Sequence, residues 1–362
     1  MKHSIFTVVI LAISVFLLPV HAGIKYVDAS CLTLVGKGMS TPGNEYHRVD
    51  TAKYGDMPAS VKHLFTYSAG LAVSFKTNSS TVAVRWTTKG RGVMGNMTPI
   101  AHRGLDLYMY AGGGWIPAGV GTPLAGKTEH ECKIAQYLES GEHKFLLYLP
   151  LFEEILSLEI GVDSAAMIEA EPSPFRHKVL IYGSSILHGA CASRAGLAYP
   201  ARMSRSTGIN FVNFGLSGRG KMEAAVADML KDVDADAFIL DCMPNPSPEE
   251  IVARTQYLVK TIREHHPGVP IIMIETYMRE NGYSNRQVRE RCLDQSKAFI
   301  TQYELLKEQG VEDLYLIRDH HAIGTDHEGS SDGTHPNDLG FDRMVQQYQP
   351  QILDILKKYG IE

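Results

Sequence analysis

The stretch Val179-Leu180-Ile181-Tyr182-Gly183-Ser184-Ser185-Ile186-Leu187-His188-Gly189 joins four apolar residues to a loop that is bracketed by glycines. A short apolar run of this kind is typical of a strand that is buried on both faces. The turn that follows can lift the hydroxyl of Ser185 out of the sheet, although a serine here can equally serve as a helix N-cap. The stretch therefore predicts the first strand of an α/β unit, with a candidate nucleophile at the carboxyl end of that strand.

The alternation of strand and helix continues toward the C-terminus. Further apolar strands are expected at residues 211–214, 237–240, 271–274 and 314–317, with helical stretches such as 223–231, 248–265 and 287–307 between them. This rhythm predicts a parallel sheet that is covered by helices on both faces. Ligands bind at the carboxyl ends of the strands in such sheets, so the loops there are the place to look for catalytic residues.

The first half of the chain has a different periodicity. Apolar and polar residues alternate in 71–75 and again in 82–86, on either side of Asn78-Ser79-Ser80, which predicts a β-hairpin. Similar alternation recurs at residues 105–110, 145–149 and 156–160. Many short strands with glycine-rich turns predict a β-sandwich over residues 23–171.

Two prolines mark the junction between the halves. Pro172 and Pro174 disfavour helix and extend the chain, so residues 172–177 are expected to form a linker. The α/β domain then occupies residues 178–362.

The N-terminal residues have the pattern of a secretory signal peptide. Lys2 and His3 precede an apolar run at residues 5–20, and Ala22 offers a small residue for cleavage. The run is shorter than the ~20 residues of a membrane-spanning helix, which favours cleavage over an uncleaved anchor. We therefore expect residues 1–22 to be removed and the protein to be periplasmic or secreted, with no integral membrane segment after cleavage.

The composition is that of an ordinary globular protein. Of 362 residues, 44% are hydrophobic and 21% are charged, and the formal net charge is −5 without a basic run. This balance argues against nucleic acid as a partner.

The five cysteines are scattered along the chain and odd in number, so at least one thiol should be free in an exported protein. One disulfide is possible, but the sequence does not show which cysteines would form it. The histidines near the C-terminus lack metal-ligand spacing, so we expect no metal.

Three later loops carry further polar candidates. Gly218 follows the second strand and can expose its N–H to a substrate, while Asn245, between two prolines, can donate its amide to a developing negative charge. Asp332 and His335 can place a carboxylate against one ring nitrogen and leave the other free to act as a base. Taken singly, these are also a permissive loop glycine, a turn asparagine and a solvated loop. Their order along successive loops predicts one shared site.

In this order the residues resemble the conserved blocks of the SGNH (GDSL-type) hydrolase family, over nearly all of residues 178–362. The matching residues are Ser185 in block I, Gly218 in block II, Asn245 in block III, and Asp332 with His335 in the last block. The resemblance implies a flavodoxin-like parallel sheet. The chain departs from the family at Ser184, where an aspartate is usual, and at Met243-Pro244-Asn245-Pro246, where G-x-N-D is usual. The G-x-S-x-G elbow of α/β-hydrolases is absent around Ser185.

The first half carries a resemblance of its own. Gly104-Leu105-Asp106-Leu107-Tyr108 matches the G-x-D-L-Y signature of a β-rich domain that precedes some hydrolases of this type. The pairing of the two domains is similar to that in bacterial carbohydrate esterases.

These observations imply two-step acyl transfer by a serine ester hydrolase that needs no cofactor. His335 takes the proton of Ser185 as the hydroxyl attacks an ester carbonyl, and Asp332 fixes the tautomer of the histidine. The N–H groups of Ser185 and Gly218 and the amide of Asn245 are expected to hold the oxyanion.

The expected substrate is a small acyl ester, with acetyl favoured, on a carbohydrate or another small molecule. One alternative is a lysophospholipase or thioesterase that acts on lipid acyl chains and would want a broad apolar channel. Another is a carbohydrate-binding protein without catalytic activity. Arg194, Arg219 and His188 are weaker candidates for substrate contact, and a solvated arginine or a packed histidine is the plainer interpretation of each.

Overall fold

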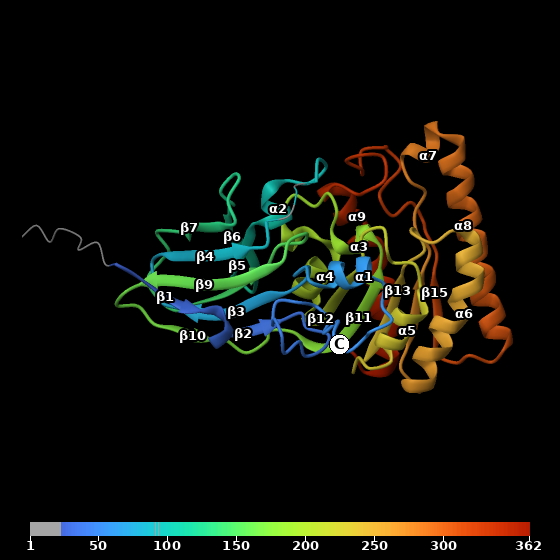
Figure 1. The fold of residues 1–362 in the computed structure, drawn as a ribbon, viewed down its shortest axis with the longest axis horizontal. Coiled ribbons are helices and arrows are strands. Elements are labelled where there is room, and N and C mark those ends of the chain that lie inside the picture. The colour runs from blue at the N-terminus through green and yellow to red at the C-terminus, as the bar shows by residue number, and fades with distance from the viewer. Residues whose placement is uncertain (1–22, 91, 93) are drawn as a thin grey trace, which may run out of the picture.

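The computed structural model describes residues 23–90, 92 and 94–362, so the expected signal peptide at residues 1–22 lies outside the described residues. A β-rich part and an α/β part lie end to end along the long axis (Figure 1). In the described residues, no helix combines the length and apolarity needed to cross a membrane.

Two antiparallel sheets form the β-rich part. One has the order β1 (Ile24–Asp28), β9 (Ile155–Asp163), β4 (Val82–Thr88) and β7 (Glu129–Ala135). The other has the order β10 (Ile168–Ala170), β3 (Ala72–Thr77), β8 (His143–Tyr148), β5 (Leu105–Ala111) and β6 (Gly114–Gly121), with β2 (Thr33–Val35) also paired to β3. Phe75 and Phe145 from the second sheet share a buried core with Trp86 from the first. The predicted β-sandwich is confirmed.

The hairpin predicted around Asn78-Ser79-Ser80 is wrong. Strand β3 pairs with β2, β8 and β10, whereas β4 pairs with β7 and β9 in the opposite sheet. The turn therefore carries the chain from one sheet to the other. Two alternating strands that face one core from opposite sides have the same sequence pattern as two strands paired in a hairpin, and the pattern does not distinguish them.

The α/β part is built on a five-stranded parallel sheet. Its order is β12 (Ile209–Gly215), β11 (Arg176–Gly183), β13 (Ala237–Asp241), β14 (Ile271–Ile274) and β15 (Leu314–Ile317). One face packs against α4 (Tyr199–Thr207) and α9 (Asp338–Leu356), and the other against α5 (Ala224–Leu230), α6 (Pro248–His265) and α8 (Arg286–Glu308). Short helices α3 (Ser185–His188) and α7 (Asn281–Ser284) lie in loops after strands. The predicted α/β fold is confirmed.

The helix boundaries follow from local chemistry. Ser247 accepts a hydrogen bond from the backbone N–H of Glu250, whose side chain accepts one in return from the N–H of Ser247, and Pro248 opens α6. This capping box satisfies backbone donors that the first turn leaves free. Asn285 caps α8 through its side-chain oxygen, which accepts from the backbone N–H groups of Gln287 and Val288.

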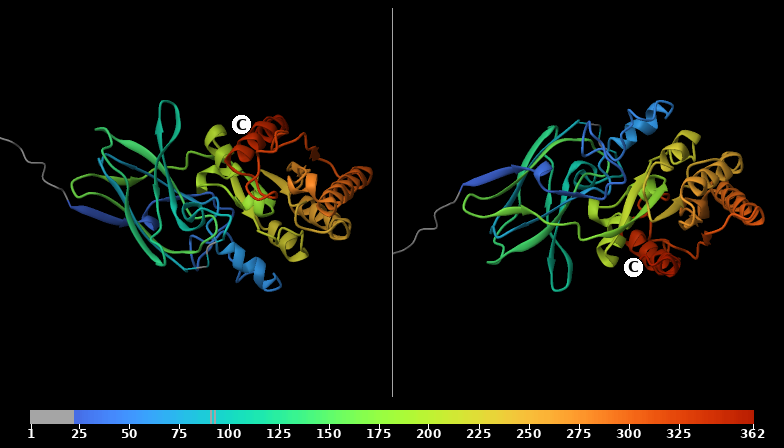
Figure 2. Two further views of the ribbon diagram at one scale, coloured as in Figure 1. Left: turned by 90° about the horizontal axis from the view of Figure 1, so that it is seen from above. Right: turned by 90° about the horizontal axis from the view of Figure 1, so that it is seen from below.

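The two parts share core residues. Helix α1 (Ala59–Phe65) precedes β3 in sequence, yet it lies beside the α/β part (Figure 2). Its Val61 and Phe65 pack with Phe214 in the core of that part. Helix α2 (Pro99–Arg103) lies at the other side of the junction, where Leu151 and Phe152 donate backbone hydrogen bonds to its carbonyls. The domain boundaries at 171 and 178 stay predictions, but the halves are not independent cores.

Arg48 is a buried polar link between them. Its guanidinium is 1% exposed and donates to the carbonyl oxygens of Asn213 at 3.0 Å and Gly215 at 2.8 Å, both on β12. It also donates to the carbonyls of Leu64 and Tyr67. Burial lowers the pKa of Arg48 to about 9. The end of β12, where the Gly218 loop begins, is therefore fixed by a residue from the first half.

Candidate active site

The loop after β11 presents Ser185 at the start of α3. The side chain of Ser184 accepts a hydrogen bond from the N–H of Ile186, so Ser184 is the N-cap of this helix. Because Ser184 supplies the cap, the hydroxyl of Ser185 does not serve as the cap and can bond another partner. Gly189 ends the helix at φ 103°, a left-handed conformation that favours glycine. The N-cap interpretation considered for this loop thus applies to Ser184 and not to Ser185.

Ser185, His335 and Asp332 form a hydrogen-bonded chain. Ser185 Oγ lies 2.9 Å from His335 Nε2, and His335 Nδ1 lies 2.8 Å from Asp332 Oδ2. Because an ionised carboxylate only accepts, Nδ1 carries the proton and Nε2 is free to accept the serine proton. The arrangement can therefore activate a hydroxyl as a nucleophile.

Asp332 is held as a carboxylate. Burial raises its pKa, but hydrogen bonds from the backbone and side chain of His335, from Asn96 and from the N–H of Thr334 outweigh this and hold the pKa well below the ordinary value of 3.8. The charged form is therefore the one that faces His335.

Residues outside its own loop fix the segment that carries Asp332 and His335. Tyr277 donates its hydroxyl to the carbonyl of Thr334 at 2.9 Å, and the N–H of Asn281 donates to the carbonyl of Gly333 at 2.9 Å. Gly333 itself has φ 81°. These contacts compensate for the lack of a regular helix or strand in this loop.

Asn245 lies in a loop whose carbonyls are tied to α8. The side-chain amide of Gln295 donates to the carbonyl oxygens of Met243, Pro244 and Pro246, the last at 2.6 Å. Asn245 Oδ1 accepts a hydrogen bond from the N–H of Gly220 at 3.1 Å. This bond distinguishes the side-chain oxygen of Asn245 from its nitrogen, and it leaves the Nδ2 group to donate to a ligand.

Gly218 lies two residues from Gly220 on an exposed turn with φ 68°, and a Cβ at this position would meet nothing within 4 Å. The roles of Ser185, Gly218 and Asn245 in holding an oxyanion stay predictions.

The three weaker candidates have different surroundings. His188 is wholly buried, lies stacked on Phe152 at a centroid distance of 4.1 Å and bonds the carbonyl of Leu151 at 2.7 Å. These contacts favour the packing interpretation of His188, and its substrate contact stays a prediction. Arg194 pairs with Asp106 at 2.7 Å and donates to Tyr108 at 2.7 Å. Arg219 is exposed beside Gly218, so its substrate contact stays a prediction.

The two partners of Arg194 are the aspartate and the tyrosine of the G-x-D-L-Y segment, which shows what these side chains contact. Asp106 is wholly buried in the β-rich part and accepts from Arg194 and from the N–H of Gly196 at 2.8 Å, both in the α/β part. Arg194 therefore bridges the two halves through its Nη1 atom, and its substrate contact stays a prediction.

Sequence reasoning missed two residues of the site. Asn96, from the first half, donates to Asp332 Oδ2 at 2.9 Å, and Cys191 Sγ lies 3.8 Å from the same oxygen. No motif marked Asn96, because its partner is 236 residues away.

Ligand atoms of Cys191, Asp332 and His335 lie within 4.8 Å of one another, a separation that a metal ion would also require. The carboxylate and imidazole are already engaged in hydrogen bonds, and burial with the nearby Asp332 charge raises the pKa of Cys191 to about 12, which disfavours a thiolate ligand. All five cysteines are free. The expected absence of a metal stays a prediction.

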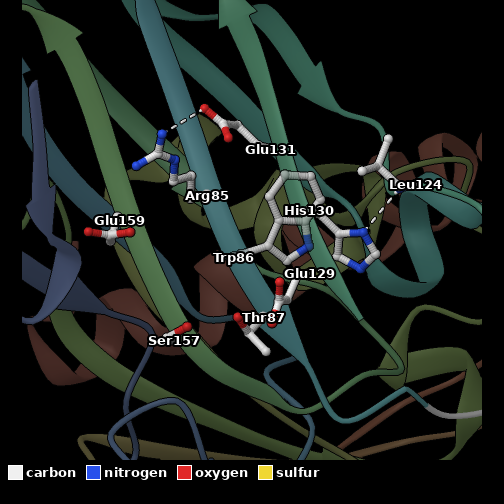
Figure 3. A pocket seen from close by; sticks show the side chains of 9 residues that line it. All are labelled: Arg85, Trp86, Thr87, Leu124, Glu129, His130, Glu131, Ser157 and Glu159. Carbon is white, nitrogen blue, oxygen red and sulfur yellow. Dashed lines mark hydrogen bonds and ion pairs between the residues drawn. The ribbon is translucent and has the colours of Figure 1, made fainter. Parts of the chain in front are cut away.

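A separate hollow lies on the outer face of the β4, β7 and β9 sheet (Figure 3). Arg85 there pairs with Glu131 at 3.1 Å, and His130 accepts from the N–H of Leu124 at 3.0 Å. Tyr26 also donates to Glu131 at 2.8 Å. We assign this hollow no function.

In comparisons with known proteins, each half of the chain matches a family model. Residues 176–353 match the model of the GDSL-like lipase/acylhydrolase family, and residues 24–168 match that of the N-terminus of SGNH-hydrolase-type esterases. A GDSL-like lipase from Bacteroides ovatus is 53% identical, with a TM-score of 0.91 over 92% of this chain and 98% of its own. No curated protein gave a match.

Two more distant structures share the fold. The salicylyl-acyltransferase SsfX3 of a tetracycline biosynthetic pathway has a TM-score of 0.71 at 19% identity, over 92% of this chain and 97% of its own. A family two carbohydrate esterase from Cellvibrio japonicus has a TM-score of 0.61 at 12% identity, over 93% of this chain and 99% of its own. At these identities the likeness is one of fold, and it covers both halves of the molecule.

Proposed function

Because the chain belongs to the GDSL-like lipase/acylhydrolase family, we propose that it is an exported serine esterase that removes small acyl groups, acetyl above all, from a carbohydrate. The observation that carries the proposal is the chain of hydrogen bonds from Ser185 through His335 to Asp332, at 2.9 and 2.8 Å. The residues that the family requires for catalysis are thus already in hydrogen-bonding contact.

The proposed reaction has two steps. His335 accepts the proton of Ser185 as Oγ attacks the ester carbonyl, and the same proton then leaves with the alcohol. Water, deprotonated by His335, releases the acyl group as the acid in the second step. Asp332 keeps the imidazole oriented and stabilises its protonated form, and the amide of Asn245 with the N–H of Gly218 and Ser185 holds the oxyanion.

The surroundings of Ser185 support a small acyl group. Ser185 is 8% exposed, while Ile186 and Leu187 beneath it are 2% and 0% exposed in the packed core. A long acyl chain would have to displace packed side chains or lie along the surface. The two-part fold is shared with the Cellvibrio carbohydrate esterase, and this likeness supports a carbohydrate as the molecule that carries the ester. Export is proposed from the N-terminal residues 1–22.

The experiment measures acetate release by the purified protein from p-nitrophenyl acetate and from acetylated polysaccharides, together with p-nitrophenyl esters of increasing chain length. Ser185→Ala should abolish release, a loss of at least about 10³-fold, because the nucleophile is gone. Ser206→Ala, which removes a hydroxyl on α4, is the matched control and should behave as wild type. Undiminished turnover in Ser185→Ala would overturn the nucleophile, and a preference for long acyl chains would overturn the small acyl group.

A further inference from the structure

Among the described residues, the carboxylate of Asp332 accepts four hydrogen bonds from nitrogen donors, one of them from the other half of the chain, and the thiol of Cys191 lies 3.8 Å from Oδ2. Oδ1 accepts from the backbone N–H of Thr334 at 2.9 Å and of His335 at 2.8 Å. Oδ2 accepts from His335 Nδ1 at 2.8 Å and from Asn96 Nδ2 at 2.9 Å. The first three come from the loop of Asp332 itself and Cys191 belongs to the α/β part, so among these described partners Asn96 is the one that ties the loop to the β-rich part.

The segment that carries Asn96 is docked along the α/β part. The sulfur of Met97 lies 2.9 Å from the N–H of Cys191, and the hydroxyl of Thr98 donates to the carbonyl of Ser193 at 2.6 Å. Thr98 also caps α2, whose carbonyls receive the N–H groups of Leu151 and Phe152. Asn96 is thus at the end of a run of three consecutive contacts and is held by its neighbours.

We propose that Asn96 is a positioning residue that sets the orientation of the Asp332 carboxylate, so that the β-rich half completes the active site. The proposal rests on the proposed esterase function. The Asp332 side chain is 29% exposed, so water would replace the amide if Asn96 were removed. Water is free to leave and reorient, whereas Asn96 is fixed, and the carboxylate would lose its preference for the orientation that faces Nδ1.

The proposal predicts a kinetic and a pH signature. Asn96→Ala should lower kcat about tenfold with little change in KM, since the lost bond is one hydrogen bond to a charged group. A carboxylate that no longer keeps facing Nδ1 stabilises the protonated imidazole less. The acid limb of the kcat/KM profile should therefore move to lower pH. Asn96→Asp keeps the side-chain shape but replaces the donor with a negative charge beside Asp332, so kcat should fall at least as far while the acid limb moves to higher pH, because the added charge favours the protonated imidazole.

The matched control removes a hydrogen bond between the halves that is remote from the triad. Tyr54 donates its hydroxyl to Asp232 Oδ2 at 2.9 Å, and Tyr54→Phe should leave kcat and the pH profile unchanged. Thermal unfolding by circular dichroism reports whether each variant folds. Because Asn96→Asp preserves side-chain shape, it decides the matter if Asn96→Ala does not fold.

The readouts are p-nitrophenyl acetate turnover and the rate at which a fluorophosphonate labels Ser185, followed by mass spectrometry. Folded Asn96 variants with wild-type kcat, or with a reduced kcat but an unmoved acid limb, would overturn the positioning role. If the wild type is labelled at Ser185 but hydrolyses no ester, the proposed function fails while the labelling rates still decide the role of Asn96. A wild type that is not labelled would overturn both.

Discussion

The loop that carries Ser185 and the loop that carries Asp332 and His335 meet at one hydrogen bond, yet they are held in opposite ways. Ser185 is 8% exposed and stands on α3, whose Ile186 and Leu187 are buried in the core. The side chains of His335 and Asp332 are 18% and 29% exposed, and their loop has no regular secondary structure. Packing places the nucleophile, whereas hydrogen bonds from Tyr277, Asn281 and Asn96 place its partners.

From this difference we expect one loop to contribute mainly to the free energy of unfolding and the other mainly to turnover. A change in the buried loop should mainly alter the free energy of unfolding, because close-packed side chains cannot rearrange cheaply. A change in the exposed loop should mainly alter turnover, because water can replace a lost hydrogen bond without unfolding the chain.

The largest expected effect on the exposed loop comes from Asp332→Asn. The asparagine amide would donate to Nδ1 of His335 and favour the tautomer that cannot accept the serine proton, so kcat should fall by about 10³–10⁴-fold. The melting temperature at neutral pH should fall by only a few degrees and unfolding should stay cooperative, since the charge is lost but Oδ1 still accepts from the backbone of Thr334 and His335. Loss of cooperative unfolding in this variant would contradict the expectation that the exposed loop mainly affects turnover.

The same variant tests the charge of Asp332. Its folded-state pKa lies below 3.8, the value expected in the unfolded chain, so the ionised carboxylate stabilises the fold above that value and this contribution is lost as the pH falls through the folded-state pKa. The difference in melting temperature between wild type and Asp332→Asn should be constant above about pH 5 and shrink in more acidic solution. A difference that grows on acidification would contradict the lowered pKa.

Asn245 is intermediate between the two loops, because it is half-exposed on a segment fixed by the buried Gln295. Asn245→Ala should lower kcat by about 10²–10³-fold with the fold intact, as expected for one oxyanion donor. Steady-state kinetics at saturating p-nitrophenyl acetate measure this. A change confined to KM would mean that the amide binds the substrate and not the transition state.

The buried loop is tested by Gly189→Ala. A Cβ at Gly189 would lie 2.9 Å from Ala198 Cβ and from Leu151 Cδ1, on a backbone with φ 103°. Strain and overpacking together should lower the free energy of unfolding by about 2–4 kcal/mol, as measured by urea denaturation. Gly208→Ala, with φ 75° and nothing within 4 Å, is the control and should cost only about 1 kcal/mol. Equal losses in the two variants would show that packing around Gly189 is not tight.

Sequence reasoning located most elements of the α/β half. The strand expected at 271–274 and the helix expected at 248–265 coincide with β14 and α6. Apolar runs bounded by turn residues are strong local signals, because each strand of a parallel sheet is buried on both faces. The short helices α1 and α2 in the first half were not expected, since five to seven residues do not establish a helical period.

The sequence by itself determined the two fold classes and the residue types of the candidate site, because periodicity and the order of Ser185, Gly218, Asn245, Asp332 and His335 are local properties of the chain. Only the tertiary structure decided that β3 and β4 lie in opposite sheets, that Arg194 bridges to Asp106, and that Asn96 reaches Asp332. These are pairings between residues far apart in sequence. A polar side chain shows its own hydrogen-bonding capacity in the sequence, but its partner is set by how the two halves pack.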